Sequence, residues 1–505
     1  MNRSDVVIVG AGPVGLLLAV ELRLGGTQVV VLDSLARPST VSRASTLHAR
    51  TMELFDQRGL LAAFRDAPVD LLSHLAGIPL DLSVTGSRYA GQWKVLQERT
   101  EQVLAERAIL DGAEVRRGVR LTGLTVRDAA TETERVELSV LGPAGPERIT
   151  CRYLIGCDGE ESTVRALAGF PVTRFPARRR LFRADIEGIE IPDRRFERLP
   201  AGVAIAARRP DGITRVMICD FEVSPDDDAE VSFEEVCGSW KRVTGEDITA
   251  GHPLWLNAFD DSVRHADTYR LGPVLLAGDA AHAHPPVGGQ AINLGLQDAA
   301  NLGWKLAATV AGRAPAGLLD SYSAERHAVG VQALTNIRAQ AALLFGGDEV
   351  EGMRGVLAEL CELPAVRASL AGAISGTGIR YPAPAGAHPC VGSPLPVVEL
   401  MTASGVTTSA ELLRSGRGLL LMLGNHPQLA REAASYAGAV MVVAARPVPP
   451  EVAECDLAAL LTRPDGYIAW AQEQSGPDRT LALRAALARW FTRPTKGVFD
   501  ESIGR

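Results

Sequence analysis

Residues 5–33, DVVIVGAGPVGLLLAVELRLGGTQVVVLD, determine the fold of this chain. Residues 6–9 form a short, β-branched apolar run, which is typical of a buried parallel strand. Good helix formers follow at 16–24, two glycines end that helix, and residues 29–32 form a second apolar run. This order of strand, glycine-rich turn, helix and strand predicts a βαβ unit.

The turn of this unit carries the spacing G-x-G-x-x-G, formed by Gly10, Gly12 and Gly15, with Pro13 at the helix start. The first glycine permits a tight turn, the second lets the backbone approach a pyrophosphate, and the third lets helix and strand pack closely. The helix N-terminus offers free N–H groups to phosphates. Asp33, at the end of the second strand, can accept hydrogen bonds from an adenosine ribose. These residues predict a dinucleotide site, and FAD and NAD both stay open.

The bulk properties narrow the class of protein. A chain of 505 residues predicts two or three domains. The net charge is −8, and no basic tail appears, so a nucleic-acid partner is not expected. The seven cysteines include no C-x-x-C pair, which fits a reducing compartment. Because the first strand starts near residue 5 and no run of about 18 apolar residues exists, we expect a cytoplasmic protein without a membrane span.

A second motif, YLIGCDGEESTVRALAGF, occupies residues 153–170. A strand expected at 148–155 runs into the turn at Asp158, and Ser162 is a plausible cap for the helix that contains Arg165. An Asp-Gly turn is common in proteins and needs no function. The alternative is that this turn lies beside the dinucleotide and contacts both it and a second cofactor.

A third motif, LGPVLLAGDAAHAHPPVGGQAINLGLQDAANLGWKLA, occupies residues 271–307. A buried strand at 274–277 ends at Asp279, and a proline- and glycine-rich loop leads into a helix at 291–308. Asp279 can accept a hydrogen bond from a ribityl hydroxyl, and the helix N-terminus can stabilise negative charge on a bound ring. His282 and His284 lack an evident third ligand, so we predict no metal site and interpret His282 as a structural residue.

The remaining segments predict further elements. Ser45 or Thr46 is a possible cap for a helix that ends near Gly59. Alternating runs within 172–267 indicate an antiparallel sheet that could cover a ligand pocket. Ser232 and Glu235 have capping-box spacing, which predicts a helix over 232–244.

Three arginines follow the glycine turn, namely Arg37, Arg43 and Arg50. We choose Arg43 as a donor to the pyrophosphate, because it lies in the loop and not on the helix. The run at 178–180 is interpreted as a solvated charge cluster, with a site for an anionic reductant as the weaker alternative. Residues 376–396 are rich in glycine and proline and read as a linker to a separate β-α-β unit.

Three motifs in this order, each at a strand end, resemble the class A flavin-dependent aromatic hydroxylases, whose type member is p-hydroxybenzoate hydroxylase. The resemblance covers nearly the whole chain. Gln97 stands where that family places a flavin-contacting glutamine. The stretches LHARTMELFDQRGLL and LGLQDAANLGWKLA look closest to bacterial oxygenases that tailor aromatic polyketides. Those proteins carry a thioredoxin-like C-terminal domain without redox cysteines, to which 397–505 looks similar.

The resemblance implies an α/β fold with a Rossmann-like FAD-binding domain of the GR2 type, an antiparallel-sheet substrate domain and a thioredoxin-like C-terminal domain. The implied boundaries are 1–70, 98–171 and 268–375 for FAD binding, 71–97 and 172–267 for the substrate, and 390–505 for the C-terminal domain. It places cofactor contacts at Gly10, Gly12, Pro13, Gly15, Asp33, Arg43, Gln97, Asp158, Gly278, Asp279, Gly288, Gly289, Ala291 and Asn293. Pro286, Gly289 and Gln290 form the implied catalytic flavin-ring loop, and no acid or base is assigned. Ala291 departs from the family, which usually has glycine there.

The resemblance further implies an FAD- and NAD(P)H-dependent monooxygenase. NADPH or NADH would reduce FAD, O2 would add to give a flavin C4a-hydroperoxide, and a phenolic, polycyclic polyketide-type substrate would be hydroxylated. The absence of a second G-x-G-x-x-G agrees with a family that lacks a separate NADPH domain. The expected partners are an aromatic small molecule and O2, and a homodimer is compatible with the sequence.

Three alternatives stay open from the sequence. Baeyer–Villiger insertion or epoxidation would use the same fold, and the motifs do not separate them from hydroxylation. A flavin halogenase is disfavoured, because no W-x-W-x-I-P stretch occurs. A non-catalytic flavin-binding or partner protein belongs to a different class and would show no substrate-stimulated NADPH oxidation.

Overall fold

The computed structural model describes residues 2–39, 44–127, 135–209, 211–225, 230–448, 456–475 and 479–493. The expected βαβ unit lies at the centre of its largest sheet, where α1 (Pro13–Leu24) connects two parallel strands. The strand and helix predictions for residues 6–32 are therefore confirmed. Five parallel strands follow in the order β8 (Glu114–Arg117), β2 (Val29–Asp33), β1 (Asn2–Val9), β11 (Gly145–Gly156) and β20 (Val274–Leu276).

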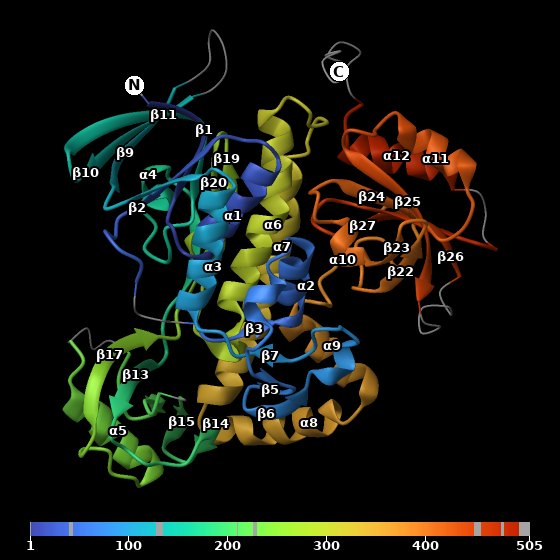
Figure 1. The fold of residues 1–505 in the computed structure, drawn as a ribbon. Helices are drawn as coiled ribbons and strands as arrows, with labels where there is room; N and C mark the ends of the chain where they lie inside the picture. Colours follow the sequence, from blue (N-terminus) through green and yellow to red (C-terminus); the bar gives the residue numbers. More distant parts are fainter. Residues whose placement is uncertain are drawn as a thin grey trace.

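Helices cover one face of this sheet. α1 packs between α3 (Gln97–Leu110) and α6 (Ala291–Val310), and the three run side by side in Figure 1. Buried strand side chains such as Val6, Ile8 and Leu154 and helix side chains such as Leu17 form one apolar core. The sheet is extended by β10 (Arg135–Gly142), which pairs antiparallel with β11, and by β9 (Arg120–Arg127), which pairs antiparallel with β10. The edge strand β19 (Arg270–Leu271) pairs antiparallel with β20.

The helix expected after the glycine turn is α2 (Ala49–Gln57), but the predicted cap is wrong. Residues 47 and 48 first form β3 (Leu47–His48), so His48 is the N-cap and Ser45 and Thr46 lie outside the helix. The cause is tertiary pairing, since β3 pairs with a strand far along the chain. The partners in this small sheet are β7 (Gln92–Trp93) and β4 (Val69–Asp70).

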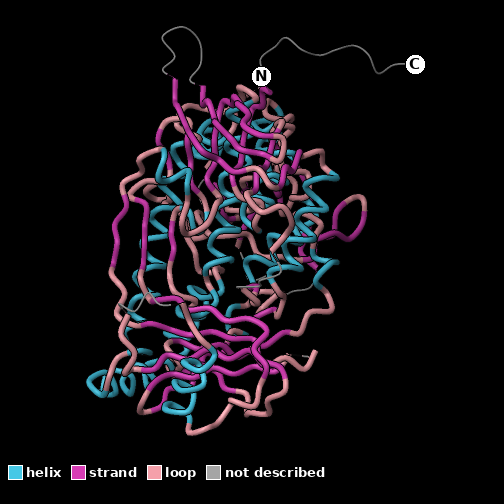
Figure 2. The backbone as a smooth tube through the Cα atoms, turned by 90° about the vertical axis from the view of Figure 1, so that its left-hand side faces the viewer, coloured by secondary structure: helices cyan, strands magenta, loops and turns pink. Residues whose placement is uncertain are grey.

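A second sheet of five antiparallel strands crosses the lower part of the molecule in Figure 2. On one face Phe182, Ala184 and Ile186 pack against α5 (Phe233–Thr244), whose Ser232–Glu235 capping box is confirmed. The opposite face carries Leu181, which packs against Val287 in the third motif. The strand order is β14 (Arg194–Leu199), β15 (Gly202–Arg208), β16 (Thr214–Asp220), β13 (Arg180–Glu187) and β17 (His252–Asp260).

Three further helices follow α6 along the chain. α7 (Asp320–Phe345) packs against α6 and runs to the second sheet, where its last turns contact β15. α8 (Glu351–Cys361) and α9 (Pro364–Ser375) pack on the hairpin of β5 (Leu72–Leu75) and β6 (Ile78–Asp81). The remaining short elements are α4 (Thr163–Leu167), β12 (Val172–Phe175), β18 (Val263–Ala266) and β21 (His282–Ala283).

The C-terminal part forms its own six-stranded sheet, at the right of Figure 1. β24 and β25 pair in parallel, and the other neighbouring strands of this sheet pair antiparallel. The order is β23 (Gly405–Thr408), β22 (Glu399–Thr402), β25 (Val440–Val448), β24 (Gly418–Met422), β26 (Leu457–Thr462) and β27 (Ile468–Glu473). Its helices are α10 (Ser409–Leu412), α11 (Pro427–Ala434) and α12 (Thr480–Trp490). Within the described ranges, no helix combines the length and the apolar character that crossing a bilayer needs.

Candidate functional site

The three sequence motifs meet at one edge of the large sheet. Parallel strands bring their carboxyl ends to the same edge, so the turns after β1, β11 and β20 become neighbours. The Cys157 N–H donates to the Val9 carbonyl (2.8 Å), and the Ala277 N–H donates to the Gly156 carbonyl (3.0 Å). Arg165 of the second motif donates to the Ala280 carbonyl of the third (3.0 Å). The motifs therefore form a single continuous site.

The glycines of the first motif serve two purposes. Gly10 has φ +107°, and a Cβ there would lie 2.2 Å from the Cys157 carbonyl oxygen, so only glycine fits. A Cβ at Gly15 would lie 2.0 Å from the Gly10 carbonyl oxygen. At Gly12, by contrast, a Cβ would meet nothing within 4 Å, although this residue caps α1. The chain thus leaves open space at the positive end of α1, which suits a pyrophosphate.

Asp33 closes the same cradle from the second strand. Its Oδ2 accepts from the Ala11 N–H and its Oδ1 accepts from the Leu35 N–H, both at 2.8 Å, and Arg117 lies 3.6 Å from Oδ2. Each carboxylate oxygen has a second lone pair, so a ribose hydroxyl can still donate to Asp33.

Asp158 is used within its own turn. Its carboxylate accepts from the Ser162 hydroxyl and the Val164 N–H (3.0 Å), and the Ser162 hydroxyl in turn accepts from the Arg165 N–H (2.9 Å). The predicted Ser162 cap of α4 is therefore confirmed. Burial raises the pKa of Asp158, while these hydrogen bonds oppose the shift. The side chain stabilises the start of α4 and orients Arg165 toward the third motif.

The third motif presents an exposed carboxylate and a loop with positive φ. Asp279 is solvent-exposed in a 3-10 turn directly after β20. Gly288 (φ +73°) and Gly289 (φ +65°) turn the chain into α6. Ala291 opens α6 with helical backbone, so this position makes no demand for the positive φ that favours glycine.

Asn293 binds this loop to the rest of the site. Its Oδ1 accepts from the His48 N–H (2.8 Å) and the Thr51 hydroxyl (2.7 Å). Its Nδ2 donates to the carbonyls of Thr46 (3.1 Å) and Gly289 (2.9 Å). The amide of Asn293 thereby connects α6, the start of α2 and the flavin-ring loop.

A buried cluster of charged and polar side chains around Asp298 supports the third motif. The sequence analysis singled out only His282 of this cluster. Asp298 accepts from His282 (2.6 Å), Arg326 (2.6 Å) and the Gly278 N–H (3.1 Å). Burial opposes the charge on Asp298, but Arg326 and His282 together hold its pKa below the usual value. His282 thus has the structural position that the sequence suggested. Arg326 lies in the second turn of the long helix α7 and carries no local sequence signal.

The loop is surrounded by buried polar atoms that lack a partner in the described chain. These are Nε2 of His284, Nε2 of Gln290 and the ring nitrogens of His48, which approach the Ile374 backbone without forming a hydrogen bond of normal geometry. His48 is fully buried, and its Nε2 lies 3.7 Å from the point where a Cβ of Gly289 would be. Buried polar groups are normally satisfied, so these atoms indicate a polar ligand at the loop. Together with the open cradle at Gly12, they fit an FAD whose ring lies against residues 286–290.

The glutamine and the arginines that the sequence singled out occupy different kinds of position. Gln97 accepts from the Ala44 N–H (3.1 Å) and donates to Glu101 (2.8 Å), which ties it to the loop before α2. Arg43 lies outside the described residues. Arg37 is exposed, and Arg50 is buried against the C-terminal domain. The described residues contain no group of three or more His, Cys, Asp and Glu side chains placed to bind a metal ion.

The second sheet turns an aromatic face toward the flavin-ring loop. Leu181 and Arg183 project from the same face of β13, because side chains alternate along a strand, and Leu181 contacts the cluster that includes Val287. Arg183 lies over the rings of Trp255 (5.0 Å) and Phe259 (5.3 Å). Such a face offers aromatic surface and positive charge to a planar, electron-rich ligand.

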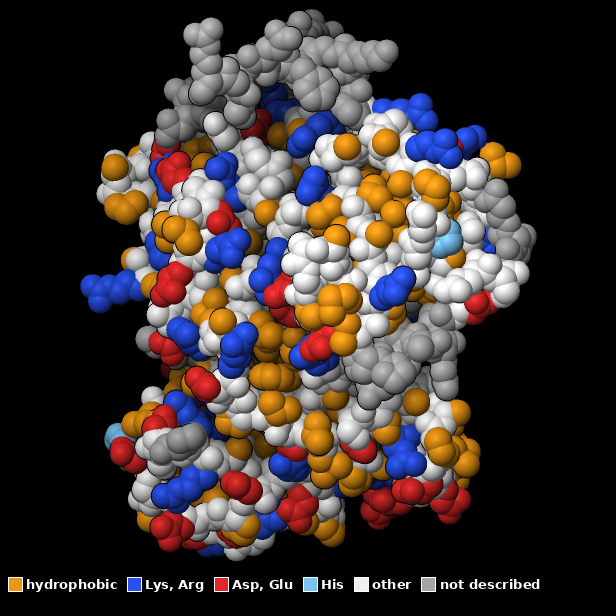
Figure 3. Space-filling view, turned by 45° about the vertical axis from the view of Figure 1, so that its right-hand side comes forward, with side chains coloured by type: hydrophobic (Ala, Val, Ile, Leu, Met, Phe, Trp, Pro, Cys, Tyr) orange, Lys and Arg blue, Asp and Glu red, His pale blue; other side chains and the backbone are white. Residues whose placement is uncertain are grey.

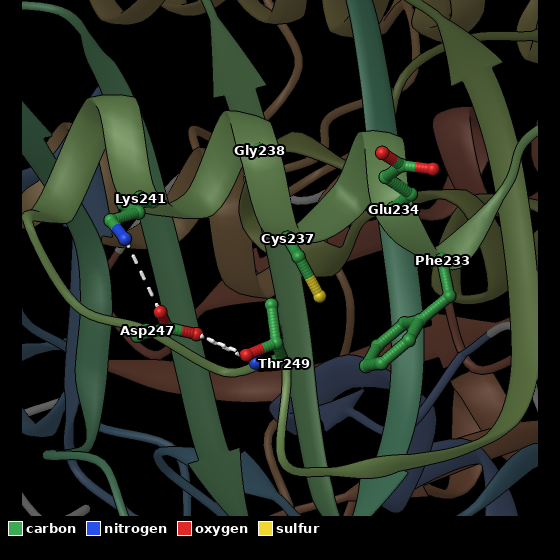
Figure 4. Close-up of a pocket in the computed structure, with 7 residues that line it drawn as sticks. All are labelled: Phe233, Glu234, Cys237, Gly238, Lys241, Asp247 and Thr249. Carbon is green, nitrogen blue, oxygen red and sulfur yellow. Dashed lines mark hydrogen bonds and ion pairs between the residues drawn. The ribbon is translucent and has the colours of Figure 1, made fainter.

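A separate cavity of about 370 Å³ lies on the outer side of this sheet. Figure 4 shows it between α5 and the segment that carries Asp247, with an ion pair between Lys241 and Asp247 across one side (3.3 Å). The α5 side of the sheet is opposite the Leu181 face, so this cavity does not belong to the flavin site.

We expect His48 to make stability depend on pH. Burial lowers the pKa of His48 to about 4 from 6.5, with the Ile374 backbone opposing the shift in part. The unfolded state binds a proton first, so stability falls as pH drops from 6.5 toward 4, by roughly 2 kcal/mol at about pH 5. Urea unfolding of the wild type and His48→Gln at about pH 7.5 and about pH 5 checks this. The variant should lose less stability, whereas equal losses would contradict the assignment.

Comparison with known proteins identifies the family. Residues 3–337 match the family described as FAD binding domain, and residues 388–494 match the one described as aromatic-ring hydroxylase, C-terminal. A curated relative from Streptomyces rimosus is a 12-dehydrotetracycline 5-monooxygenase/anhydrotetracycline 6-monooxygenase. It is 42% identical, over 97% of this chain and 99% of the relative.

Solved structures support the same family assignment. An aromatic hydroxylase from angucycline biosynthesis superposes with a TM-score of 0.90 and 44% identity, over 97% of this chain and 99% of that one. A Diels-Alderase from the biosynthetic pathway of pyrroindomycins superposes with a TM-score of 0.83 and 36% identity, over 97% and 100%. Given these matches along nearly its whole length, the chain belongs to the family of FAD-binding aromatic-ring hydroxylases.

Proposed function

We propose that this protein is an FAD- and NAD(P)H-dependent monooxygenase that hydroxylates a phenolic, polycyclic substrate of the polyketide type. One observation carries the proposal: unpartnered buried polar atoms of His48, His284 and Gln290 surround a loop that faces the aromatic side of the second sheet. That arrangement supports a flavin ring on one side and a planar aromatic substrate on the other. The tetracycline-modifying relative and the angucycline hydroxylase support the same substrate class.

Residues of the three motifs have proposed roles in binding the cofactor. The turn at Gly12 and the start of α1 receive the pyrophosphate, Asp33 accepts from the ribose, and Asp279 accepts from the ribityl chain. The proposed ring loop comprises Pro286, Gly289 and Gln290. Further proposed contacts are Gly10, Pro13, Gly15, Arg43, Gln97, Asp158, Gly278, Gly288, Ala291 and Asn293.

Bound reduced flavin supplies the activation of O2 that oxygen insertion needs. The chain's own residues position the reactants and control charge. The N-terminus of α6 stabilises negative charge at the ring loop, and the Leu181 face of the second sheet excludes water from it. Because its pKa is about 4, His48 is a neutral imidazole at pH 7, and its ring can offer a hydrogen bond at Nε2 beside Gly289.

We further propose the domain division expected from the sequence, with a thioredoxin-like C-terminal domain over 390–505. The support is topological. β24, α11 and β25 form a parallel β-α-β unit, and β26 and β27 add antiparallel beside β24 before α12. The resulting order β25-β24-β26-β27 is that of a thioredoxin core.

The proposal predicts substrate-stimulated consumption of NADPH. Protein reconstituted with FAD is mixed with tetracyclic and tricyclic phenols, and NADPH oxidation is followed by absorbance. A rate at least about tenfold above the substrate-free rate is expected for a true substrate, because an aromatic ligand completes the site. NADH replaces NADPH in a parallel series to define the reductant.

One result would contradict the proposed reaction, and another would leave its type to be determined. Conversion of a substrate without NADPH consumption would favour a cycloaddition such as that of the Diels-Alderase relative, which needs no reductant. Stoichiometric NADPH consumption with one added oxygen leaves hydroxylation, epoxidation and Baeyer–Villiger insertion, and the product's NMR spectrum separates these.

A further inference from the structure

The turn between β26 and β27 inserts a buried charged loop into the flavin-binding part of the chain. We name residues 463–467, Arg-Pro-Asp-Gly-Tyr, the docking loop. Arg463 and Asp465 are each only 2% exposed, although both are charged. Charged side chains are almost never buried to this extent unless they are paired. The partners of the docking loop therefore show what it does.

The docking loop contacts helix α7 and, through it, α6. Arg463 donates to Glu325 of α7 (2.6 Å) and to Asp465 within the loop (3.1 Å). Glu325 also accepts from Lys305 and Asn301 of α6, both at 2.8 Å. Burial disfavours the charge on Glu325, yet Arg463 and Lys305 hold its pKa at about 2, so the carboxylate stays charged.

The same loop contacts helix α2. Arg50 donates to the Asp465 carbonyl (2.8 Å), and Arg58, at the end of α2, donates to the Pro464 carbonyl (2.9 Å). A Cβ at Gly466 would lie 2.7 Å from Gln57, which shows how closely the loop approaches the helix. The buried ionisable groups of this network are four cations and four anions: Arg50, Arg58, Lys305, Arg463, Glu21, Glu53, Glu325 and Asp465.

Helices α2 and α6, which the docking loop connects, both begin at the proposed flavin site. Arg50 lies two residues after His48, and Gln297 lies one turn after Asn293 and donates to its carbonyl (3.1 Å). A small cavity of about 10 Å³ joins the three parts, since Arg50, Gln297 and Asp465 all line it. The docking loop therefore fixes α2 against α6 near the residues that surround the flavin-ring loop.

Apolar contacts also join the C-terminal domain to α6. Trp304 of α6 already packs into the C-terminal core with Trp490 and Phe491. Buried ion pairs add little net stability compared with apolar packing, and they repay the cost of burying charge only where their geometry is well matched. In the space-filling view of Figure 3, charged side chains of both signs are interspersed over the face that is shown. The charged residues of the network differ from these surface charges because they are buried.

We propose that Arg463 and Asp465 of the C-terminal domain are positioning residues of the flavin site, which set the arrangement of α2 and α6 and thereby the affinity for FAD. This inference rests on FAD binding, but not on the identity of the substrate. It gives the C-terminal domain a role in the cofactor site although none of its residues lies among the proposed cofactor contacts.

The test compares FAD dissociation constants in full-length variants, with binding followed by flavin fluorescence and visible circular dichroism. Arg463→Met and Asp465→Asn should each weaken FAD binding by about tenfold or more and alter the visible spectrum of the bound flavin. Arg463→Lys, which keeps the charge, should recover part of the affinity. Arg484→Met removes an ion pair with Glu432 inside the C-terminal domain and serves as the matched control, with unchanged FAD binding.

Folding is monitored in each apo variant by circular dichroism. If Arg463→Met does not fold, Glu325→Gln preserves the shape of the buried group and carries the same expectation. Folded docking-loop variants that bind FAD within about twofold of the wild type, with an unchanged flavin spectrum, would overturn the proposal. A wild type that binds no FAD would overturn the proposed function as well, so the two failures are distinguishable.

Discussion

Gly10→Ala should unfold or severely destabilise this protein, whereas Gly12→Ala should leave the apoprotein folded and weaken FAD binding. At Gly10 the new Cβ would lie 2.2 Å from a backbone carbonyl oxygen, and φ is +107°. Backbone strain and overpacking add to a loss of roughly 3 kcal/mol or more in unfolding free energy. At Gly12 the new methyl group meets no protein atom within 4 Å, so the apoprotein should change by less than about 1 kcal/mol.

The pair of variants separates folding from cofactor binding. Urea unfolding of the apoproteins gives stability, and titration with FAD gives affinity, which should fall by about tenfold or more in Gly12→Ala. Unchanged affinity in Gly12→Ala would show that the pyrophosphate does not approach the start of α1. Wild-type stability in Gly10→Ala would contradict the close contact between the first and second motifs.

Asp298→Asn should cost about 3 to 5 kcal/mol of stability, because it leaves the fully buried guanidinium of Arg326 without its countercharge. The flavin-ring loop should loosen at the same time, since Asp298 also holds His282 and the Gly278 N–H. Thermal and urea unfolding of the apoprotein measure the first effect, and hydrogen exchange at residues 278–290 measures the second.

Asp279→Asn is the matched control for this prediction. Asp279 belongs to the same motif but is exposed, so its amide variant should keep apoprotein stability within about 0.5 kcal/mol. Its FAD affinity should nevertheless decrease, because the ribityl contact loses a charged acceptor. Equal destabilisation by the two variants would show that Asp298 is not a special support of the loop.

The sequence was sufficient for features that are encoded locally. The βαβ unit follows from the glycine spacing between two apolar runs, and the Ser232–Glu235 box fixed the start of α5. Each motif could also be placed at a strand end, and parallel pairing then brings these ends to one edge. Local spacing therefore predicted the βαβ unit and the position of each motif at a strand end, whereas the cofactor contacts assigned to these residues stay predictions.

The rest depends on contacts between distant residues. His48 lies at the start of α2 beside the loop at 286–290 only because β3 pairs with β7, and no local sequence pattern predicts that pairing. Arg326 reaches Asp298 from another helix, and Arg50 reaches Asp465 across a domain boundary. Such partners are chosen by tertiary packing, so spacing alone could not separate Arg50 from a solvated surface charge.

The most direct test of the central claim is isotopic. Protein with FAD and NADPH is supplied with ¹⁸O2 and a phenolic polycyclic substrate that stimulates NADPH oxidation, and the product is analysed by mass spectrometry. The account predicts a product heavier by one oxygen, about 18 Da in ¹⁸O2 and about 16 Da in ordinary oxygen, with none formed without NADPH. A product that forms equally well without NADPH or under nitrogen, or that carries oxygen from water, would contradict it.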